Sequence, residues 1–173
     1  MDLKAKIRTV PHWPIKGVMF RDITTLLQDG PAFQQACDEL YRRYRTEKID
    51  VVVGIESRGF IVGAVLAYKL GVGFVPARKP GKLPYKTVHE EYEKEYGKDS
   101  IAMHEDAIRK GQRVLLVDDL IATGGTCAAA ARLIERMGGE IVECAFLIDL
   151  PDLGGKEKLK GHKVFALMEF EGD

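Results

Sequence analysis

The stretch from Val114 to Thr126, VLLVDDLIATGGT, constrains the fold more than any other part of this sequence. A run of apolar residues ends in two acids, and a Thr-Gly-Gly-Thr turn leads directly into the alanine-rich stretch Cys127 to Met137. Strands that are apolar at successive positions are typical of parallel sheets, because helices cover both of their faces. The stretch therefore predicts a buried strand, a tight turn and a helix within an α/β sheet.

Two units of strand, helix and strand are predicted along the chain. The expected elements are, in order, an amphipathic helix that begins at Gly30-Pro31 after the cap Asp29, a strand over Ile49 to Val53, a helix over Phe60 to Leu70, a strand over Gly73 to Ala77, a strand over Val114 to Val117, a helix over Cys127 to Met137 and a strand over Ile141 to Ile148. Gly71 and Gly138-Gly139 are expected to end the second and third helices. This order predicts the α/β class, with a mostly parallel central sheet flanked by helices.

Length and charge limit the classes of protein that fit. A chain of 173 residues predicts a single domain over residues 1–173. Lys plus Arg and Asp plus Glu both number 26, so no net charge attracts nucleic acid or an anionic membrane. The longest mainly apolar stretch, Gly59 to Tyr68, is far shorter than the ~20 residues that cross a bilayer. With no secretory signal pattern either, we expect a cytoplasmic protein with no nucleic-acid partner and no membrane partner.

The cysteines and histidines do not predict a metal site. Cys37, Cys127 and Cys144 show no CxxC spacing and are expected to be reduced, packed side chains. The four histidines show no ligand spacing such as HxxxH, so no protein-bound transition metal is expected.

The turn after the acids predicts a phosphate site. Ligands of open α/β sheets lie at the carboxyl ends of strands, where the N–H groups of a helix start attract anions. Gly124 and Gly125 allow close approach of a phosphate, and the hydroxyls of Thr123 and Thr126 can donate to it. The two acids, which would repel a bare phosphate, suit a ribose diol instead. The alternative is that this is only a tight strand-to-helix turn. The sequence contains neither GxxxxGK(S/T), the motif that holds the phosphates of ATP or GTP, nor GxGxxG, the motif of dinucleotide binding, so a kinase and a dehydrogenase are not favoured.

A long polar stretch separates the two units. It runs from Pro80 to Asp106 and is longer than an ordinary connection. It predicts either an active-site lid or a solvated hairpin extension, and its composition alone does not decide between them.

Several motifs together resemble one family, the type I phosphoribosyltransferases. The Val114 to Thr126 string resembles that family's signature for phosphoribosyl pyrophosphate throughout its length. Further motifs resemble the family's adenine-specific members: GVMFRDIT at Gly17 to Thr24, ESRGF at Glu56 to Phe60, ARKPGKLP at Ala77 to Pro84 and EYGKD at Glu95 to Asp99. The resemblance covers nearly the whole chain and implies the type I phosphoribosyltransferase fold with a flexible lid over the active site.

The resemblance implies a role for each matched residue. The phosphoribosyl group is expected on Asp118, Asp119, Ala122, Thr123, Gly124, Gly125 and Thr126, the pyrophosphate on Ser57, Arg58, Arg78, Lys79 and Lys82, and the base on Met19, Phe20, Arg21 and Leu150. Glu95 is expected to be the catalytic acid or base. The base site lies in an N-terminal hood over about residues 1–30 and the lid over about residues 80–106; the Glu56-Ser57 peptide bond is expected to be cis. Without the motifs, Phe20 reads as core and Glu95 as one member of a charge run.

The activity that the resemblance implies is transfer of a 5-phosphoribosyl group from phosphoribosyl pyrophosphate to N9 of adenine. The products are AMP and pyrophosphate, a purine-salvage reaction. Mg²⁺ is the expected cofactor, carried by the substrate rather than held mainly by the protein, and a homodimer is expected. Two other classes stay open: a regulatory protein that kept the site without catalysis, and an enzyme of the same fold acting on xanthine, hypoxanthine, guanine or orotate.

Overall fold

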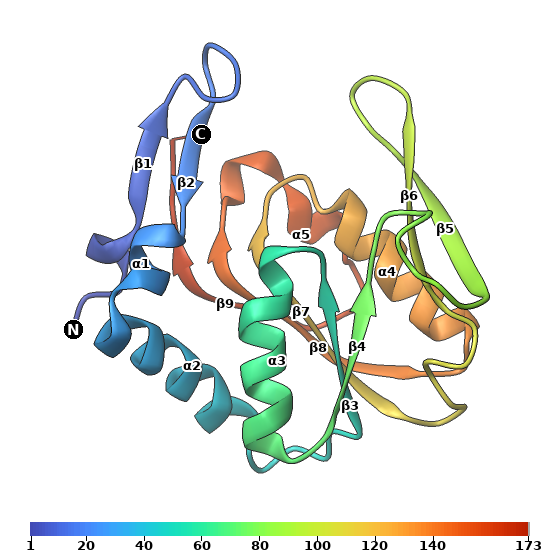
Figure 1. Cartoon of the computed structure of the whole chain (residues 1–173). Coiled ribbons are helices and arrows are strands. Elements are labelled where there is room, and N and C mark those ends of the chain that lie inside the picture. Colours follow the sequence, from blue (N-terminus) through green and yellow to red (C-terminus); the bar gives the residue numbers. More distant parts are fainter. Residues whose placement is uncertain (173) are drawn as a thin grey trace.

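A five-stranded parallel sheet forms the centre of the computed structural model, which describes residues 1–172 (Figure 1). The strands lie side by side in the order β4 (Gly73–Ala77), β3 (Val51–Ile55), β7 (Arg113–Ile121), β8 (Glu140–Asp149) and β9 (Val164–Glu169). All four neighbouring pairs are parallel. The predicted α/β class and parallel sheet are confirmed, and β9 is a strand that the sequence analysis did not predict.

Helices lie on both faces of this sheet. They are α1 (Thr24–Gln28), α2 (Gly30–Tyr44), α3 (Arg58–Leu70), α4 (Gly125–Arg136) and the short α5 (Gly155–Lys158), with 3-10 turns η1 (Lys4–Lys6) and η2 (Pro151–Leu153). Asp29 caps α2 as predicted, because its carboxylate accepts a 3.1 Å hydrogen bond from the N–H of Ala32. Gly71 ends α3 in the left-handed conformation, with φ of 70°.

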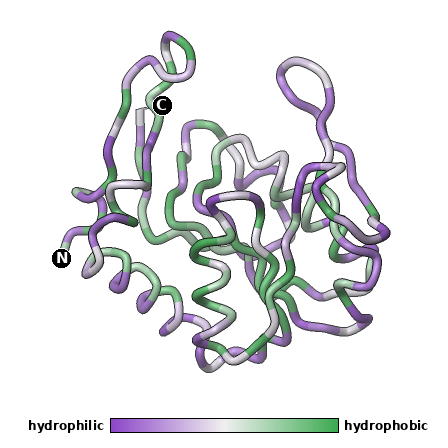
Figure 2. The backbone as a smooth tube through the Cα atoms, viewed as in Figure 1, coloured by the Kyte–Doolittle hydropathy of each residue, from purple (hydrophilic) through white to green (hydrophobic). Residues whose placement is uncertain are grey.

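Alternate residues of the central strands pack into two separate cores. Val52 and Leu115 belong to the core under α2 and α3, whereas Val53 and Leu116 belong to the core under α4. All four are completely buried, which explains why these strands are apolar at every position. Figure 2 shows hydrophobic residues concentrated along the central strands and hydrophilic residues at the periphery.

Two antiparallel hairpins stand at opposite sides of the molecule (Figure 1). The first consists of β1 (Arg8–Pro11) and β2 (Met19–Asp22), within the predicted base-binding hood. The second consists of β5 (Thr87–Glu93) and β6 (Lys98–His104). The long polar stretch is therefore largely a hairpin, as one of its two interpretations described; that it closes over a substrate stays a prediction.

The β5–β6 hairpin is attached to the body of the molecule rather than solvated on all sides. Ala102 of β6 exchanges two backbone hydrogen bonds with Arg78, at 2.9 and 2.7 Å. Glu90 accepts from Arg132 and Arg136 of α4, at 3.2 and 2.5 Å. The base of the hairpin is thus held both by the end of β4 and by α4.

The strand order contains one point at which the chain changes its direction of travel across the sheet. From β3 the chain moves outward to β4, whereas from β7 it moves the other way to β8 and β9. Ligands of open α/β sheets bind at such a point, beyond the carboxyl ends of the two strands. The two predicted phosphate loops follow β3 and β7, so the topology places them next to each other.

Within residues 1–172, every helix is too short or too polar to span a bilayer. Cys37, Cys127 and Cys144 are buried free thiols, as predicted. Burial raises the pKa of the Cys37 thiol to about 11.

Candidate active site

The loop after β7 is a tight turn that leads directly into α4. β7 continues to Ile121, four residues beyond its predicted end at Val117, so Asp118 and Asp119 lie within the second half of the strand. Gly124 precedes α4 with a left-handed φ of 82°. The first N–H groups of a helix have no partner within it, and a cavity of about 120 Å³ is lined by Asp118 and by Leu120 to Cys127. The turn therefore has the geometry of an anion site at a helix N-terminus.

Two glycines, Gly124 in the turn and Gly155 at the start of α5, set the position of this turn. A Cβ added at Gly124 would lie 2.4 Å from the carbonyl oxygen of Gly155, and a Cβ added at Gly155 would lie 2.4 Å from that of Ala122. Both contacts are with backbone, which cannot rotate away as a flexible side chain can. The turn and the start of α5 therefore approach each other at a distance that only glycine permits.

The two acids differ in their surroundings. Asp119 is 5% exposed, and its Oδ2 lies 2.5 Å from Nε of Arg58. Asp118 accepts a 2.8 Å hydrogen bond from the N–H of Asp119. Burial, and then the neighbouring charge of Asp119, raise the pKa of the Asp118 carboxyl well above its usual range. The pair therefore repels a nearby phosphate less than two fully ionised carboxylates would.

Arg58 connects the predicted base site to the predicted ribose site. Its guanidinium carbon lies 5.7 Å from the ring centroid of Phe20, while its Nε contacts Asp119. The Phe20 ring also meets Trp13 edge-on, with centroids 4.4 Å apart. Residues far apart in the sequence, from β2, the start of α3 and the end of β7, are thus brought together.

The peptide bond between Glu56 and Ser57 is cis, as expected from the resemblance.

Two of the predicted pyrophosphate cations, Arg78 and Lys82, gather around the carboxylate of Glu56, and Lys79 contributes its backbone N–H. Its Oε2 lies 2.7 Å from Nζ of Lys82 and 3.5 Å from Arg78, and its Oε1 accepts from the N–H of Lys79. Burial acts to raise the pKa of Glu56, but the hydrogen bonds from Lys82 and from the Lys79 N–H outweigh it and lower that pKa. Among the described residues 1–172, Nε of Arg78 has no hydrogen-bond partner, although it is buried. Glu56 thus balances cations that a polyanion could take over.

Lys79 is held by the β5–β6 hairpin. Its ammonium contacts the carboxylate of Asp99 and donates a 2.7 Å hydrogen bond to the hydroxyl of Tyr92. The same hydroxyl accepts a 3.1 Å hydrogen bond from Oγ1 of Thr126 in the phosphate turn. The hairpin therefore reaches residues of both predicted phosphate loops.

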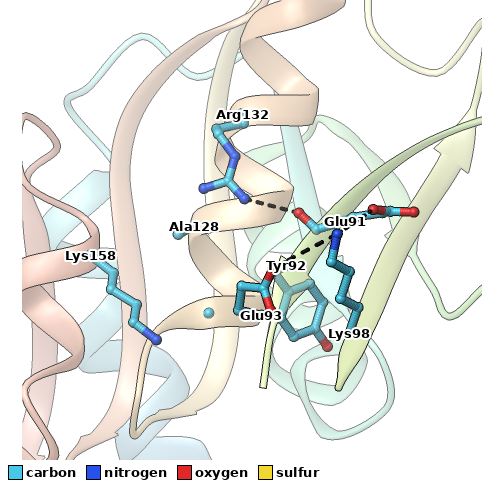
Figure 3. Close-up of a pocket in the computed structure, with 8 residues that line it drawn as sticks. Glu91, Tyr92, Glu93, Lys98, Ala128, Arg132 and Lys158 are labelled. Atoms are coloured by element: carbon cyan, nitrogen blue, oxygen red, sulfur yellow. Dashed lines mark hydrogen bonds and ion pairs between the residues drawn. The ribbon is translucent and has the colours of Figure 1, made fainter. Parts of the chain in front are cut away.

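A larger cavity lies beside the phosphate turn rather than over it. Its volume is about 440 Å³. Its lining comes from the hairpin, α4 and α5: Glu91, Tyr92, Glu93, Lys98, Gly125, Ala128, Arg132 and Lys158 (Figure 3). Acids and bases are mixed in this lining, and Lys98 lies 3.8 Å from both Glu91 and Glu93. Neither Asp118 nor Asp119, the predicted acids of the ribose site, lines this larger cavity. We therefore place the candidate active site at the turn between β7 and α4.

Some predicted residues are not brought into the cluster. Glu95 is exposed at the tip of the β5–β6 hairpin, between Lys94 and Gly97, whose backbones share a 2.9 Å hydrogen bond. Leu150 follows β8, is 6% exposed and donates its N–H to Ile121 at 3.0 Å, next to the phosphate turn. Met19 and Arg21 flank Phe20 in β2. The roles of these residues stay predictions.

Three residues of the cluster were not singled out from the sequence: Glu56, Tyr92 and Gly155. Glu56 was expected to belong to the pyrophosphate turn and to the cis peptide bond, but its carboxylate was given no role. Gly154-Gly155 repeats the paired glycines of the phosphate turn, which was a usable signal. Tyr92 stands among charged residues in TVHEEYE, where strand alternation directs it to the same face as Val88.

No metal cluster is present in the part of the chain that the structure describes, if a cluster is taken as three or more His, Cys, Asp or Glu side chains able to hold one ion. Asp118 and Asp119 supply hard carboxylate oxygens, which suit Mg²⁺ as one or two ligands beside those of a substrate. The donor chemistry therefore fits a magnesium ion that a polyphosphate substrate carries, with the protein as a minor ligand.

The chain is similar to a known family, to relatives in sequence and to solved structures. Residues 24–168 match the family described as phosphoribosyl transferase domain. The chain is 65% identical to the adenine phosphoribosyltransferase of Desulfosudis oleivorans, over 100% of both chains. The adenine phosphoribosyltransferase structure from Thermoanaerobacter pseudethanolicus has a TM-score of 0.95 at 48% identity, over 98% of both chains. That from Saccharomyces cerevisiae, complexed with an imino-altritol bisphosphate and adenine, has a TM-score of 0.91 at 42% identity, covering 96% of this chain and 97% of that one.

The parallel sheet, the turn into α4 and the family match over residues 24–168 agree, and the chain belongs to the phosphoribosyl transferase family. Enzymes of this class are transferases. Full-length relatives at this level of identity place the chain in the adenine phosphoribosyltransferase branch of the family.

Proposed function

We propose that this protein transfers the 5-phosphoribosyl group of phosphoribosyl pyrophosphate to N9 of adenine, with Mg²⁺, to give AMP and pyrophosphate. The observation that carries the proposal is the adjacency of two anion-binding loops at the ends of β3 and β7, with Arg58 joining them to Phe20. A substrate with a phosphate at one end and a pyrophosphate at the other requires two such loops on either side of a ribose.

In the proposed reaction, a bond forms between N9 of adenine and C1′ of the ribose while the bond from C1′ to a pyrophosphate oxygen breaks. The turn from Thr123 to Thr126 binds the 5′-phosphate, and Asp118 and Asp119 accept from the ribose hydroxyls. Arg78 and Lys82 exchange their contacts with Glu56, and Lys79 its contact with Asp99, for the pyrophosphate, whose negative charge grows as it leaves. Bound Mg²⁺ adds neutralisation of that charge.

Glu95 is proposed to accept the one proton that the imidazole ring of adenine loses, from N9 or from N7 according to the tautomer, as N9 bonds to C1′. A water molecule would capture the oxocarbenium-like ribosyl centre if it entered, so we propose that the β5–β6 hairpin excludes water when substrates are bound. This hairpin also carries Glu95 and is attached to the pyrophosphate cations through Lys79. Its closure would therefore bring the acid or base to the base site.

Selection of adenine is proposed to come from the backbone of β2. In the two-stranded sheet, β2 pairs with β1 along one edge only. Because the backbone groups of alternate residues in an antiparallel pair face away from the partner strand, those of every second residue of β2 face its other edge. Pro11, the partner of Met19, also has no N–H to donate to β2. Adenine presents a donor at its 6-amino group and an acceptor at N1, whereas hypoxanthine and guanine reverse both. A fixed backbone pair at Met19 and Arg21 would leave these 6-oxopurines unpaired.

The test is a panel of bases. We expect the protein, mixed with phosphoribosyl pyrophosphate and Mg²⁺, to release pyrophosphate with adenine at a kcat/KM about 10⁴-fold above that with hypoxanthine or guanine, because mismatched buried polar groups discriminate strongly. Preference for a 6-oxopurine or orotate would overturn the choice of base. Absence of turnover with every base would favour a regulatory protein that kept only the binding site.

Three further features belong to the same proposal: a part in purine salvage, a cytoplasmic location and a homodimeric assembly. The full-length identity with adenine phosphoribosyltransferases supports the first of these. The homodimer is inferred from the family resemblance and is tested by the mass of the protein in solution.

A further inference from the structure

Tyr92 occupies a position between the two predicted phosphate loops. It lies on β5 and is 9% exposed, although its neighbours Glu91 and Glu93 are exposed. Its ring packs against the first residue of α4, since a Cβ added at Gly125 would lie 3.2 Å from Cδ2 of Tyr92. Figure 3 shows the ring among the side chains between the hairpin and α4.

The hydroxyl of Tyr92 is a shared acceptor. It accepts from Nζ of Lys79 at 2.7 Å and from Oγ1 of Thr126 at 3.1 Å. Lys79 belongs to the predicted pyrophosphate loop and Thr126 to the predicted 5′-phosphate turn. The ammonium of Lys79 lies 5.3 Å from the centroid of the Tyr92 ring, beyond the hydroxyl, so the hydroxyl rather than the ring face holds it. One oxygen atom thus links the ammonium of Lys79 to the turn at the start of α4, and so sets the spacing between the two predicted phosphate loops.

This spacing matters only for a ligand that uses both loops at once. The ribose ring of phosphoribosyl pyrophosphate limits the separation of its two anionic ends, and donors held in advance at a suitable separation bind it with a smaller loss of freedom. AMP carries the 5′-phosphate but no pyrophosphate, so it does not sense the position of Lys79.

We propose that the Tyr92 hydroxyl is a positioning group that holds the pyrophosphate and 5′-phosphate loops at the separation phosphoribosyl pyrophosphate requires. The inference rests on the proposed function, because it takes the ammonium of Lys79 and the N–H groups of the turn that includes Thr126 as donors to the two ends of that substrate. Tyr92 touches neither reacting atom; it acts through these two side chains.

Tyr92→Phe is the direct test, because it keeps the ring against Gly125 and removes only the shared oxygen. We expect KM for phosphoribosyl pyrophosphate to rise about tenfold, the effect of losing one charge-assisted hydrogen bond. The kcat and the Kd for AMP are expected to change by less than about twofold. The matched control is Tyr68→Phe, which removes a hydroxyl from a side chain that is 87% exposed on α3 and is expected to change none of these values.

The outcomes separate the inference from the proposed function. An unchanged KM for phosphoribosyl pyrophosphate in Tyr92→Phe, with an active wild-type enzyme, overturns the inference alone. Equal losses in kcat, KM and AMP affinity together with a lower Tm also overturn it, because they indicate only a structural role. A wild-type protein without turnover on any base overturns the proposed function instead, and AMP binding then still reports on the phosphate turn.

Discussion

Replacing Gly124 by alanine is expected to raise KM for phosphoribosyl pyrophosphate about a hundredfold. The residue has a φ of 82°, and an added Cβ would lie 2.4 Å from the carbonyl oxygen of Gly155. Because that contact is with backbone, the turn must move away from α5, and its N–H groups then lose their aim at the phosphate. A hundredfold change is about 2.7 kcal/mol, which the loss of one charge-assisted hydrogen bond of about 1.5–3 kcal/mol accounts for. Steady-state kinetics with varied phosphoribosyl pyrophosphate measure it.

Gly161→Ala is the matched control for this substitution. Gly161 also has a left-handed φ, of 97°, but an added Cβ there meets nothing within 4 Å. Both variants carry the strain of alanine in the left-handed region, about 1–2 kcal/mol, and both should lower Tm by a few degrees. Only Gly124→Ala should change KM. Equal KM values in the two variants would show that the close approach to Gly155 does not position the phosphate turn.

Replacing Glu95 by glutamine is expected to lower kcat by about 10²-fold or more, the usual effect of removing a general acid or base. Glutamine keeps the shape of the side chain but cannot exchange a proton with the purine. Since Glu95 lies at the exposed tip of the hairpin, it should contribute little to the free energy of unfolding or to the binding of phosphoribosyl pyrophosphate alone. Single-turnover measurements with both substrates saturating report the chemical step without product release.

The control for that variant is Glu93→Gln, on the same hairpin and likewise exposed, with 78% of its side-chain surface accessible. This change removes one charge from the same run of acids, and we expect kcat to stay within about twofold. If the two variants slow the reaction equally, the charge of the hairpin as a whole matters and Glu95 has no separate role. If neither slows it, Glu95 is not the acid or base.

The central sheet was predictable because each of its inner strands is buried on both faces. Strands such as β4 and helices such as α3 were recognised within two residues of their bounds, since runs of apolar residues end at Gly71 or at polar turns. β9 was not predicted, although its residues Val164 to Met168 form a short apolar run that was a usable signal. Most of these residues are only half-buried, and β9 lies at the edge of the sheet.

The candidate site was predictable where the chemistry lies within one short segment. The turn from Asp118 to Thr126 is of that kind, because a strand, a tight turn and a helix start follow one another directly. Contacts between distant segments were not predictable. The pairing of Arg58 with Asp119, the gathering of cations on Glu56 and the shared hydroxyl of Tyr92 each depend on the order of strands in the sheet, which a local pattern does not contain.

The most direct test of the account is a crystal structure of the protein with AMP. We expect the 5′-phosphate to accept hydrogen bonds of about 3 Å from the N–H groups of the turn between Thr123 and Thr126. The ribose hydroxyls should lie at a similar distance from the carboxylates of Asp118 or Asp119, with the adenine ring against Phe20. A ribose monophosphate bound anywhere else on the molecule, including the larger cavity beside α4, would contradict the account.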